Sequence, residues 1–299
     1  MEIKHLKTFS KVAQCLHFNQ AAKALNCSQS TVSAQIKLLE EELDLLLFDR
    51  LGKKIILTDA GHKLVRYAQK IINLEKETLS DLRENCEPFG LISLRASQSI
   101  GAYLIPDILS QFSAKYPRVS FNVETCSLAS LKDELRSGII DLAFLFTDYI
   151  NGNGFQTESL RVEPLVLIAG PDHRLATKEE ICIKDMAGET IILPKHDCGY
   201  KMVFEKMLSE ANIKTCAKME FNSVEAVKQC VIKGLGITII PKLSVQNEIE
   251  ESKLVILPLK DEILETSVSM IWHKNKWLSP TLTEFMNCAR KRICLVSKK

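Results

Sequence analysis

Neutral hydrogen-bonding side chains gather near the beginning of the chain, between residues 28 and 35. Glutamine, serine and threonine can bond to base edges or to phosphates. A basic turn follows at residues 50–54, and lysine and arginine neutralise phosphate charge. Residues 1–37 hold five lysines against one glutamate, although the whole chain has a net charge of +2. Together with Asn19 and Gln20, the two groups predict a local site for double-stranded DNA, formed by Gln29, Ser30, Thr31, Ser33, Gln35, Arg50, Lys53 and Lys54.

A second set of polar side chains stands where expected strands pass into expected helices. Such junctures occur at residues 97–99, 196–201 and 222–223. Hydroxyl and amide groups can converge there with the free backbone N–H groups of a helix start, and together they suit an anion. We therefore expect a small, carboxylate-bearing effector. The candidate effector-binding residues are Ser97, Gln98, Ser99, Thr147, Cys198, Tyr200, Lys201, Asn222 and Ser223.

Short helices and a hairpin must position the DNA-binding residues. Apolar residues recur at three- and four-residue intervals over residues 3–16, which predicts a helix with one buried face. We expect Asn19 to cap a second helix over residues 20–25 and Ser28 to cap a third. The third helix has an apolar stripe, and its other face is expected to carry Gln29, Ser30, Thr31, Ser33 and Gln35. Residues 47–58 predict a β-wing.

A long helix is expected after the wing, from Asp59 to Asn85. Residues 59–85 contain no proline, and their apolar residues follow a near-heptad pattern. A helix of about 39 Å is too long to pack on a small winged domain alone, so we expect it to pair with the same helix of a second subunit. The near-heptad residues are Leu64, Ala68, Ile71, Leu74, Thr78 and Leu82, and Leu64, Ile71 and Leu74 are expected to form the seam.

The rest of the chain alternates between strand and helix patterns. This alternation predicts two α/β lobes with two chain crossings, with a ligand between the lobes at the strand ends. Expected strands cover residues 91–97, 120–125, 141–146, 165–170, 190–195, 218–222, 237–242 and 267–272. Expected helices cover residues 103–115, 128–137, 178–188, 200–211, 223–233 and 279–293.

The predicted fold is therefore α/β, with three regions. Residues 1–60 form an N-terminal winged helix-turn-helix, and residues 61–87 form a long linker helix for dimerisation. Residues 88–299 form a two-lobed, type II periplasmic-binding-like effector domain. Lobe I covers about residues 90–162 and 266–295, and lobe II covers about residues 163–265.

Composition and missing motifs exclude several classes of protein. With 46% hydrophobic and 25% charged residues, the chain is neither disordered nor fibrous. We expect no membrane span, because about 18 apolar residues never run together. Ten cysteines without a secretory signal predict a cytoplasmic protein. The G-x-S-x-G and H-E-x-x-H motifs are absent, so we expect no enzyme, cofactor or metal.

Several stretches resemble the LysR-type transcriptional regulators. Residues 18–40, 47–50 and 57–61 are similar to the DNA-binding domain of this family, and residues 96–103, 138–143 and 224–237 look like recurrent blocks of its effector domain. The family often has a basic residue where Ala34 stands. The resemblance implies a homodimer or homotetramer whose partners are double-stranded DNA and a small-molecule effector.

Two alternatives remain beside this interpretation. Cys198 begins an expected helix near Lys201, and both features lower a thiol pKa, so a redox-sensing regulator is the first alternative. Peroxide-sensing relatives use a cysteine near this region, but Cys216 lies 18 residues away, without a recognisable sensor spacing. We therefore expect Cys198 to line the effector pocket. A solute-binding protein, the second alternative, conflicts with the N-terminal winged helix.

Overall fold

The computed structural model divides the chain into two compact units. It describes residues 1–51, 54–81, 87–125, 128–148, 150, 152–195, 198–213, 217–260 and 264–296. One unit contains residues 1–86 with 133–139, and the other contains residues 87–132 with 140–299. The boundary at residue 88 between the linker helix and the effector domain stays a prediction.

The first unit begins with a winged helix-turn-helix, as the sequence predicted. Phe9 and Val12 from the first helix, Val32 and Leu39 from the third, and Phe48 from the wing are buried in one core. The ring centroids of Phe9 and Phe48 lie 5.4 Å apart, so the wing packs on the first helix. The elements are α1 (Ile3–Cys15), α2 (Phe18–Ala24), α3 (Gln29–Leu43), β1 (Phe48–Leu51) and β2 (Lys54–Leu57).

The two predicted helix caps have different outcomes. Ser28 caps α3, and its hydroxyl accepts the backbone N–H of Thr31 at 3.1 Å. The cap assigned to Asn19 is wrong, because α2 already begins at Phe18 and its N-cap residue is His17. Asn19 therefore lies inside the first turn of α2 with its side chain exposed.

The linker helix α4 (Asp59–Asp81) packs on its own winged domain along part of its length. Ala68 and Ile72 are buried in the winged-domain core, and Leu64 and Ile71 pack against that core. Leu64 and Ile71, which the heptad pattern assigned to a seam between subunits, thus contact their own domain. Leu74 and Leu79 remain exposed, at 62% and 47%. Leu82, the last residue of the near-heptad pattern, lies outside the described residues.

A mixed sheet forms the frame of the second unit. Its strands lie in the order β10, β6, β11, β5, β3, β4, and β9 also pairs with β6. The pairs of β3 with β4 and β5 are parallel, whereas β11 is antiparallel to both β5 and β6. The strands are β3 (Gly90–Ala96), β4 (Val119–Thr125), β5 (Leu142–Phe146), β6 (Phe155–Ala169), β9 (Thr238–Pro241), β10 (Val255–Leu257) and β11 (Glu265–His273).

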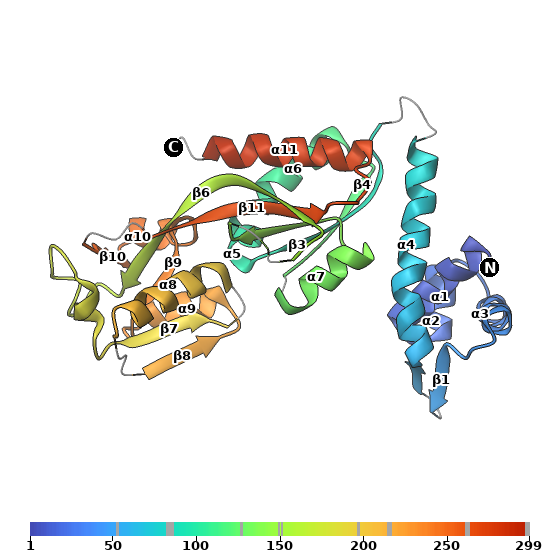
Figure 1. The fold of residues 1–299 in the computed structure, drawn as a ribbon, viewed down its shortest axis with the longest axis horizontal. Helices are drawn as coiled ribbons and strands as arrows, with labels where there is room; N and C mark the ends of the chain where they lie inside the picture. Colours follow the sequence, from blue (N-terminus) through green and yellow to red (C-terminus); the bar gives the residue numbers. More distant parts are fainter. Residues whose placement is uncertain are drawn as a thin grey trace. The chain divides into compact units, whose positions relative to one another are not determined.

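One long strand, β6, belongs to both lobes. Residues 155–164 of β6 pair with β11 in lobe I, and residues 165–169 pair with β9 and β10 in lobe II. Figure 1 shows β6 beside β11 and then continuing toward β9 and β10. Lobe II also contains the parallel pair of β7 (Thr190–Pro194) and β8 (Ala217–Phe221). The sequence predicted only residues 165–170 of β6 and missed β10.

Most helices of the second unit lie where the sequence placed them. Two expectations are wrong. Residues 103–115 form the end of one helix and all of another, because Pro106 starts a new helix. The helix expected over residues 178–188 is a 3-10 turn, Ile183–Met186. The helices are α5 (Gln98–Tyr103), α6 (Ile105–Lys115), α7 (Leu128–Ser137), α8 (Cys198–Glu210), α9 (Val224–Ile232), α10 (Gln246–Glu250) and α11 (Pro280–Val296), with the 3-10 turn η2 (Lys242–Ser244).

Candidate functional site

The first turn of α3 presents a connected row of polar side chains. Gln29, Ser30 and Thr31 are exposed, and Ser33 is half-buried. The Ser28 hydroxyl lies 2.7 Å from that of Ser30 and 2.8 Å from that of Thr31. Gln29 Nε2 donates to Ser33 Oγ at 2.8 Å. The face that the sequence predicted for base contacts therefore lies on the surface at the N-terminus of α3.

Gln35 does not lie on this face. Its side chain is buried, and its Oε1 accepts a hydrogen bond from Thr8 Oγ1 at 2.6 Å. The bond joins α3 to α1 inside the winged domain, where a buried amide needs a partner. The expectation that Gln35 is exposed for DNA contact is wrong, and Gln35 instead holds α3 on α1.

The wing is an antiparallel hairpin in which Arg50 pairs with Ile55 and Leu51 with Lys54. Lys53 lies outside the described residues, as do the side chains of Arg50 and Lys54. On α2, Asn19 and Gln20 are both exposed. Apart from the buried Gln35, the described residues of the predicted DNA site thus lie at the surface of one small domain.

In the second unit, predicted effector residues meet at the ends of two neighbouring strands. Ser97 follows β3, and its backbone N–H donates to the carbonyl of Phe144 in β5 at 3.0 Å. Ser97 is 6% exposed, and its Oγ is buried without a hydrogen-bond partner among the described residues. Thr147 follows β5 and is half-buried. Ser99, on the first turn of α5, is 1% exposed.

The start of α8 in lobe II packs against the same strand end. A Cβ atom on Gly199 would lie 1.6 Å from the carbonyl oxygen of Phe146, so only glycine fits there. The buried Tyr200 ring meets the Phe146 ring edge-to-face, with 5.9 Å between their centroids. His196 and the side chain of Cys198 lie outside the described residues. The backbone nevertheless places the start of α8 beside the strand that leads to Thr147.

The start of α9 is tied to lobe I through Gln98. Gln98 Nε2 donates to the carbonyl of Asn222 at 2.7 Å, and the backbone N–H of Val224 donates to Gln98 Oε1 at 2.8 Å. Ser223 caps α9, because its hydroxyl accepts the N–H of Ala226. Three of the predicted residues, Gln98, Asn222 and Ser223, are thus brought together.

Lys201 has a partner within lobe II. Its Nζ lies 2.6 Å from Glu220 Oε1 on β8. The hydrogen bond and charge of Lys201 lower the pKa of Glu220, and Lys218 contributes in the same direction. The sequence interpretation used the ammonium group of Lys201 to bind an anion or to activate Cys198. In the structure, the carboxylate of Glu220 neutralises this ammonium group.

The sequence interpretation missed a buried lysine. Lys228 is 2% exposed, and its Nζ lies 2.5 Å from Glu248 Oε1, 2.9 Å from Glu225 Oε2 and 3.0 Å from the hydroxyl of Tyr103. Burial opposes its charge, but these three hydrogen bonds outweigh burial and raise the pKa of Lys228. A signal was available, because Lys228 stands beside Val224, Val227 and Val231 on the buried stripe of α9.

A buried ion pair was also missed, on the part of β6 that approaches lobe II. Arg161 and Glu163 have side chains 6% and 5% exposed, and Arg161 Nη2 lies 2.5 Å from Glu163 Oε2. Glu163 Oε1 accepts the backbone N–H of Leu243 at 2.9 Å. Burial raises the pKa of Glu163, although Leu243 and Arg161 act in the opposite direction.

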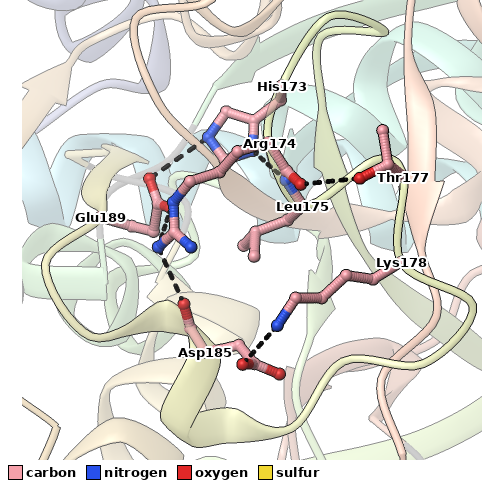
Figure 2. Close-up of polar contacts among 7 residues, drawn as sticks. All are labelled: His173, Arg174, Leu175, Thr177, Lys178, Asp185 and Glu189. Carbon is pink, nitrogen blue, oxygen red and sulfur yellow. Dashed lines mark hydrogen bonds and ion pairs between the residues drawn. The ribbon is translucent and has the colours of Figure 1, made fainter.

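Another polar cluster, shown in Figure 2, joins His173, Arg174 and Glu189 in lobe II. His173 Nδ1 accepts the N–H of Leu175 at 3.2 Å, and its Nε2 lies 3.2 Å from Glu189 Oε2. Arg174 Nη2 lies 2.5 Å from Glu189 Oε1. These contacts hold the segment after β6 in place. Within the described ranges, no three His, Cys, Asp or Glu residues are placed to hold a metal ion, and no helix is long and apolar enough to cross a membrane.

Comparison with known proteins covers nearly the whole chain. The profile described as "Bacterial regulatory helix-turn-helix protein, lysR family" matches residues 3–62, and that described as "LysR substrate binding domain" matches residues 87–293. YwqM, an uncharacterised HTH-type transcriptional regulator of Bacillus subtilis, is 35% identical over 97% of this chain and 99% of its own length.

Two solved structures are similar in fold. A full-length OxyR from Pseudomonas aeruginosa has a TM-score of 0.76 at 23% identity, over 99% of this chain and 95% of its own. CbnR, solved in complex with its target DNA, has a TM-score of 0.69 at 20% identity, over 98% of this chain and 100% of its own. At these identities the likeness establishes the fold.

Proposed function

Because the chain belongs to the LysR family of DNA-binding transcriptional regulators, we propose that a small carboxylate-bearing effector, bound between the two lobes, controls how α3 and the wing bind DNA. The exposed first turn of α3 supports the DNA part of this proposal. Its hydroxyl and amide groups are of the types that bond to base edges in the major groove. The proposed DNA contacts are Asn19, Gln20, Gln29, Ser30, Thr31, Ser33, Arg50, Lys53 and Lys54.

Gln29→Ala is expected to relax the base preference of DNA binding. A lost base contact costs about 1 to 3 kcal/mol of discrimination against the wrong base. Binding to a selected operator and to its single-base variants, at one fixed salt concentration, measures this loss. Gln14→Ala is the matched control, because Gln14 is an exposed glutamine on α1 of the same domain. Equal behaviour of the two variants would remove Gln29 from the DNA site.

The buried hydroxyl of Ser97 carries the effector part of the proposal. A buried hydroxyl without a partner costs free energy, so its presence at a strand end favours a role in binding a ligand. Ser99, Thr147 and the start of α8 with Cys198 and Tyr200 lie around the same pair of strand ends. We propose that these groups donate to the effector carboxylate. A screen of small mono- and dicarboxylates for thermal stabilisation identifies the effector, since a ligand at 100 times its Kd adds about 2.7 kcal/mol.

Ser97→Ala is expected to weaken effector binding without lowering the stability of the unliganded protein. The loss should be about 0.5 to 1.5 kcal/mol, or up to about 3 kcal/mol if the hydroxyl meets a charged group. The unliganded melting temperature should stay the same or rise, because an unpaired hydroxyl has been removed. Calorimetric titration and thermal unfolding measure the two effects. Ser10→Ala, which removes a buried, unpartnered hydroxyl in the winged domain, should leave the titration unchanged.

The same titration separates effector binding from thiol sensing by Cys198. The pairing of Lys201 with Glu220 disfavours thiol sensing, because the lysine charge that could activate a thiol is already neutralised. Cys198→Ser should therefore keep most of the effector response. If Cys198→Ser loses a response to peroxide while Ser97→Ala behaves as the unmodified protein, the protein senses peroxide through Cys198 and the proposal of effector binding is wrong.

A further inference from the structure

The short helix α5 of lobe I touches lobe II at both of its ends. At its first residue, the Gln98 side chain bonds to the backbone at the start of α9. At its last residue, the Tyr103 hydroxyl accepts a hydrogen bond from Lys228 at 3.0 Å. Five residue steps separate the two contacts, which corresponds to about 7.5 Å along a helix axis. Two separated contacts resist rotation of one lobe against the other, whereas a single contact can act as a pivot.

The Gln98 contact is made to backbone groups rather than to side chains. The side-chain amide of Gln98 donates to the Asn222 carbonyl and accepts from the Val224 N–H, so its donor and its acceptor are both used. The Val224 N–H belongs to the first turn of α9, where backbone N–H groups have no acceptor within the helix. Gln98 therefore supplies from lobe I an acceptor that lobe II would otherwise take from water.

The Tyr103 contact is made to a buried charge. Lys228 already meets two carboxylates of its own lobe, Glu225 and Glu248, and Tyr103 completes a set of three acceptors for its three N–H donors. The two carboxylates keep the ammonium group charged even without Tyr103. The tyrosine hydroxyl is thus the lobe I component of this cluster, and Tyr103 can leave it without exposing an unpaired charge.

We propose that Gln98 and Tyr103 form a two-point clasp through which α5 holds the lobes together before any effector binds. Gln98 is then a positioning residue and not a direct ligand of the effector. The clasp follows directly after Ser97, so a ligand at Ser97 would bind beside the first contact point and bias the same equilibrium between closed and open lobes. The proposal concerns the effector-free protein and does not depend on which effector binds.

Amide hydrogen exchange on the full-length, effector-free protein tests the clasp. Tyr103→Phe removes the second contact and leaves Gln98 intact. If the two contacts hold one lobe arrangement, exchange of the Val224 N–H should rise about 2- to 10-fold in Tyr103→Phe, the factor that corresponds to one net hydrogen bond. Gln98→Ala should raise the same rate further. Combining the two substitutions should add little to Gln98→Ala alone, because the lobes are already released.

Two matched variants control for local damage. Tyr116→Phe removes a tyrosine hydroxyl that bonds to Glu284 within lobe I at 3.2 Å, and Gln246→Ala removes an exposed glutamine of α10. Both should leave the Val224 exchange rate unchanged. The clasp is refuted if Tyr103→Phe also leaves that rate unchanged, or changes it no more than Tyr116→Phe does. If Gln98→Ala fails to fold, the comparison of Tyr103→Phe with Tyr116→Phe still decides the question.

Discussion

Leu74→Asp is expected to split the assembled protein into monomers. Leu74 is 62% exposed on α4 and is not among the residues of the helix that pack in the core of its own winged domain. We propose that this exposed face of α4 pairs with a second subunit, because two half-sites on DNA require two readers. An aspartate there would be buried without a partner, which costs about 3 to 5 kcal/mol and raises the dimer Kd by a factor of at least about 100.

Sedimentation at micromolar protein measures the mass of this variant. Leu46→Asp is the matched control, because Leu46 is an even more exposed leucine, at 70%, that lies outside α4. It should leave the mass unchanged. Ile71→Asp is a poorer test, since Ile71 packs against the core of its own domain and its substitution would disturb the winged fold. An unchanged mass for Leu74→Asp would place the contact between subunits elsewhere.

Glu163→Ala is expected to lower the free energy of unfolding of the second unit by about 3 to 5 kcal/mol, because it leaves the buried Arg161 without its partner. Both tryptophans, Trp272 and Trp277, stand in this unit, so their fluorescence during denaturant unfolding reports on it. Glu158→Ala is the control on the same strand. Glu158 forms an ion pair with Arg290 in which both side chains are about one-third exposed, so this pair should contribute about 0 to 1 kcal/mol. An equal decrease in the free energy of unfolding in the two variants would contradict the prediction.

The raised pKa of Glu163 also predicts how the stability of the protein depends on pH. Burial raises its pKa in the folded protein above the ordinary value of 4.5, so the unfolded chain releases this proton first. The part of the stability that comes from protonation of Glu163 is therefore complete below pH 4.5 and is lost as the pH rises through the folded pKa. Glu163→Gln should remove this part of the slope of the free energy of unfolding against pH. Denaturant unfolding in steps from pH 4 to pH 7 tests it, and a slope that persists in Glu163→Gln would belong to other groups.

Local patterns in the sequence predicted most of the elements. The Ser28 cap, the wing and seven of the expected strands depend on neighbouring residues, and the structure has them close to the predicted bounds. Gln35 shows where such patterns fail. It stands three residues after Val32, beside the apolar stripe of α3, and it is buried because Thr8, 27 residues earlier, supplies a partner. Periodicity within one helix contains no information about a donor on another.

The candidate effector site was predicted by residue type but not by contact. Serine and glutamine at strand ends indicated polar groups near a ligand, and Ser97 lies at such an end. The partner of Gln98 is a backbone carbonyl 124 residues away, which no local pattern specifies. The polar first half of β6 was missed for a similar reason, because only its pairing with β11 makes it a strand.

The position of β11 has a consequence for the time course of protein synthesis. β11 lies between β5 and β6 in the sheet, although it follows both in the chain. Translation of the intervening residues 147–264 takes about 6 to 24 s at about 5 to 20 residues per second. During that time β5 lacks its neighbour and offers an unpaired, apolar strand edge to other nascent chains. A slowly translated or truncated message should therefore yield aggregated rather than degraded protein, and chaperones that bind extended apolar segments should engage the chain before β11 emerges from the ribosome.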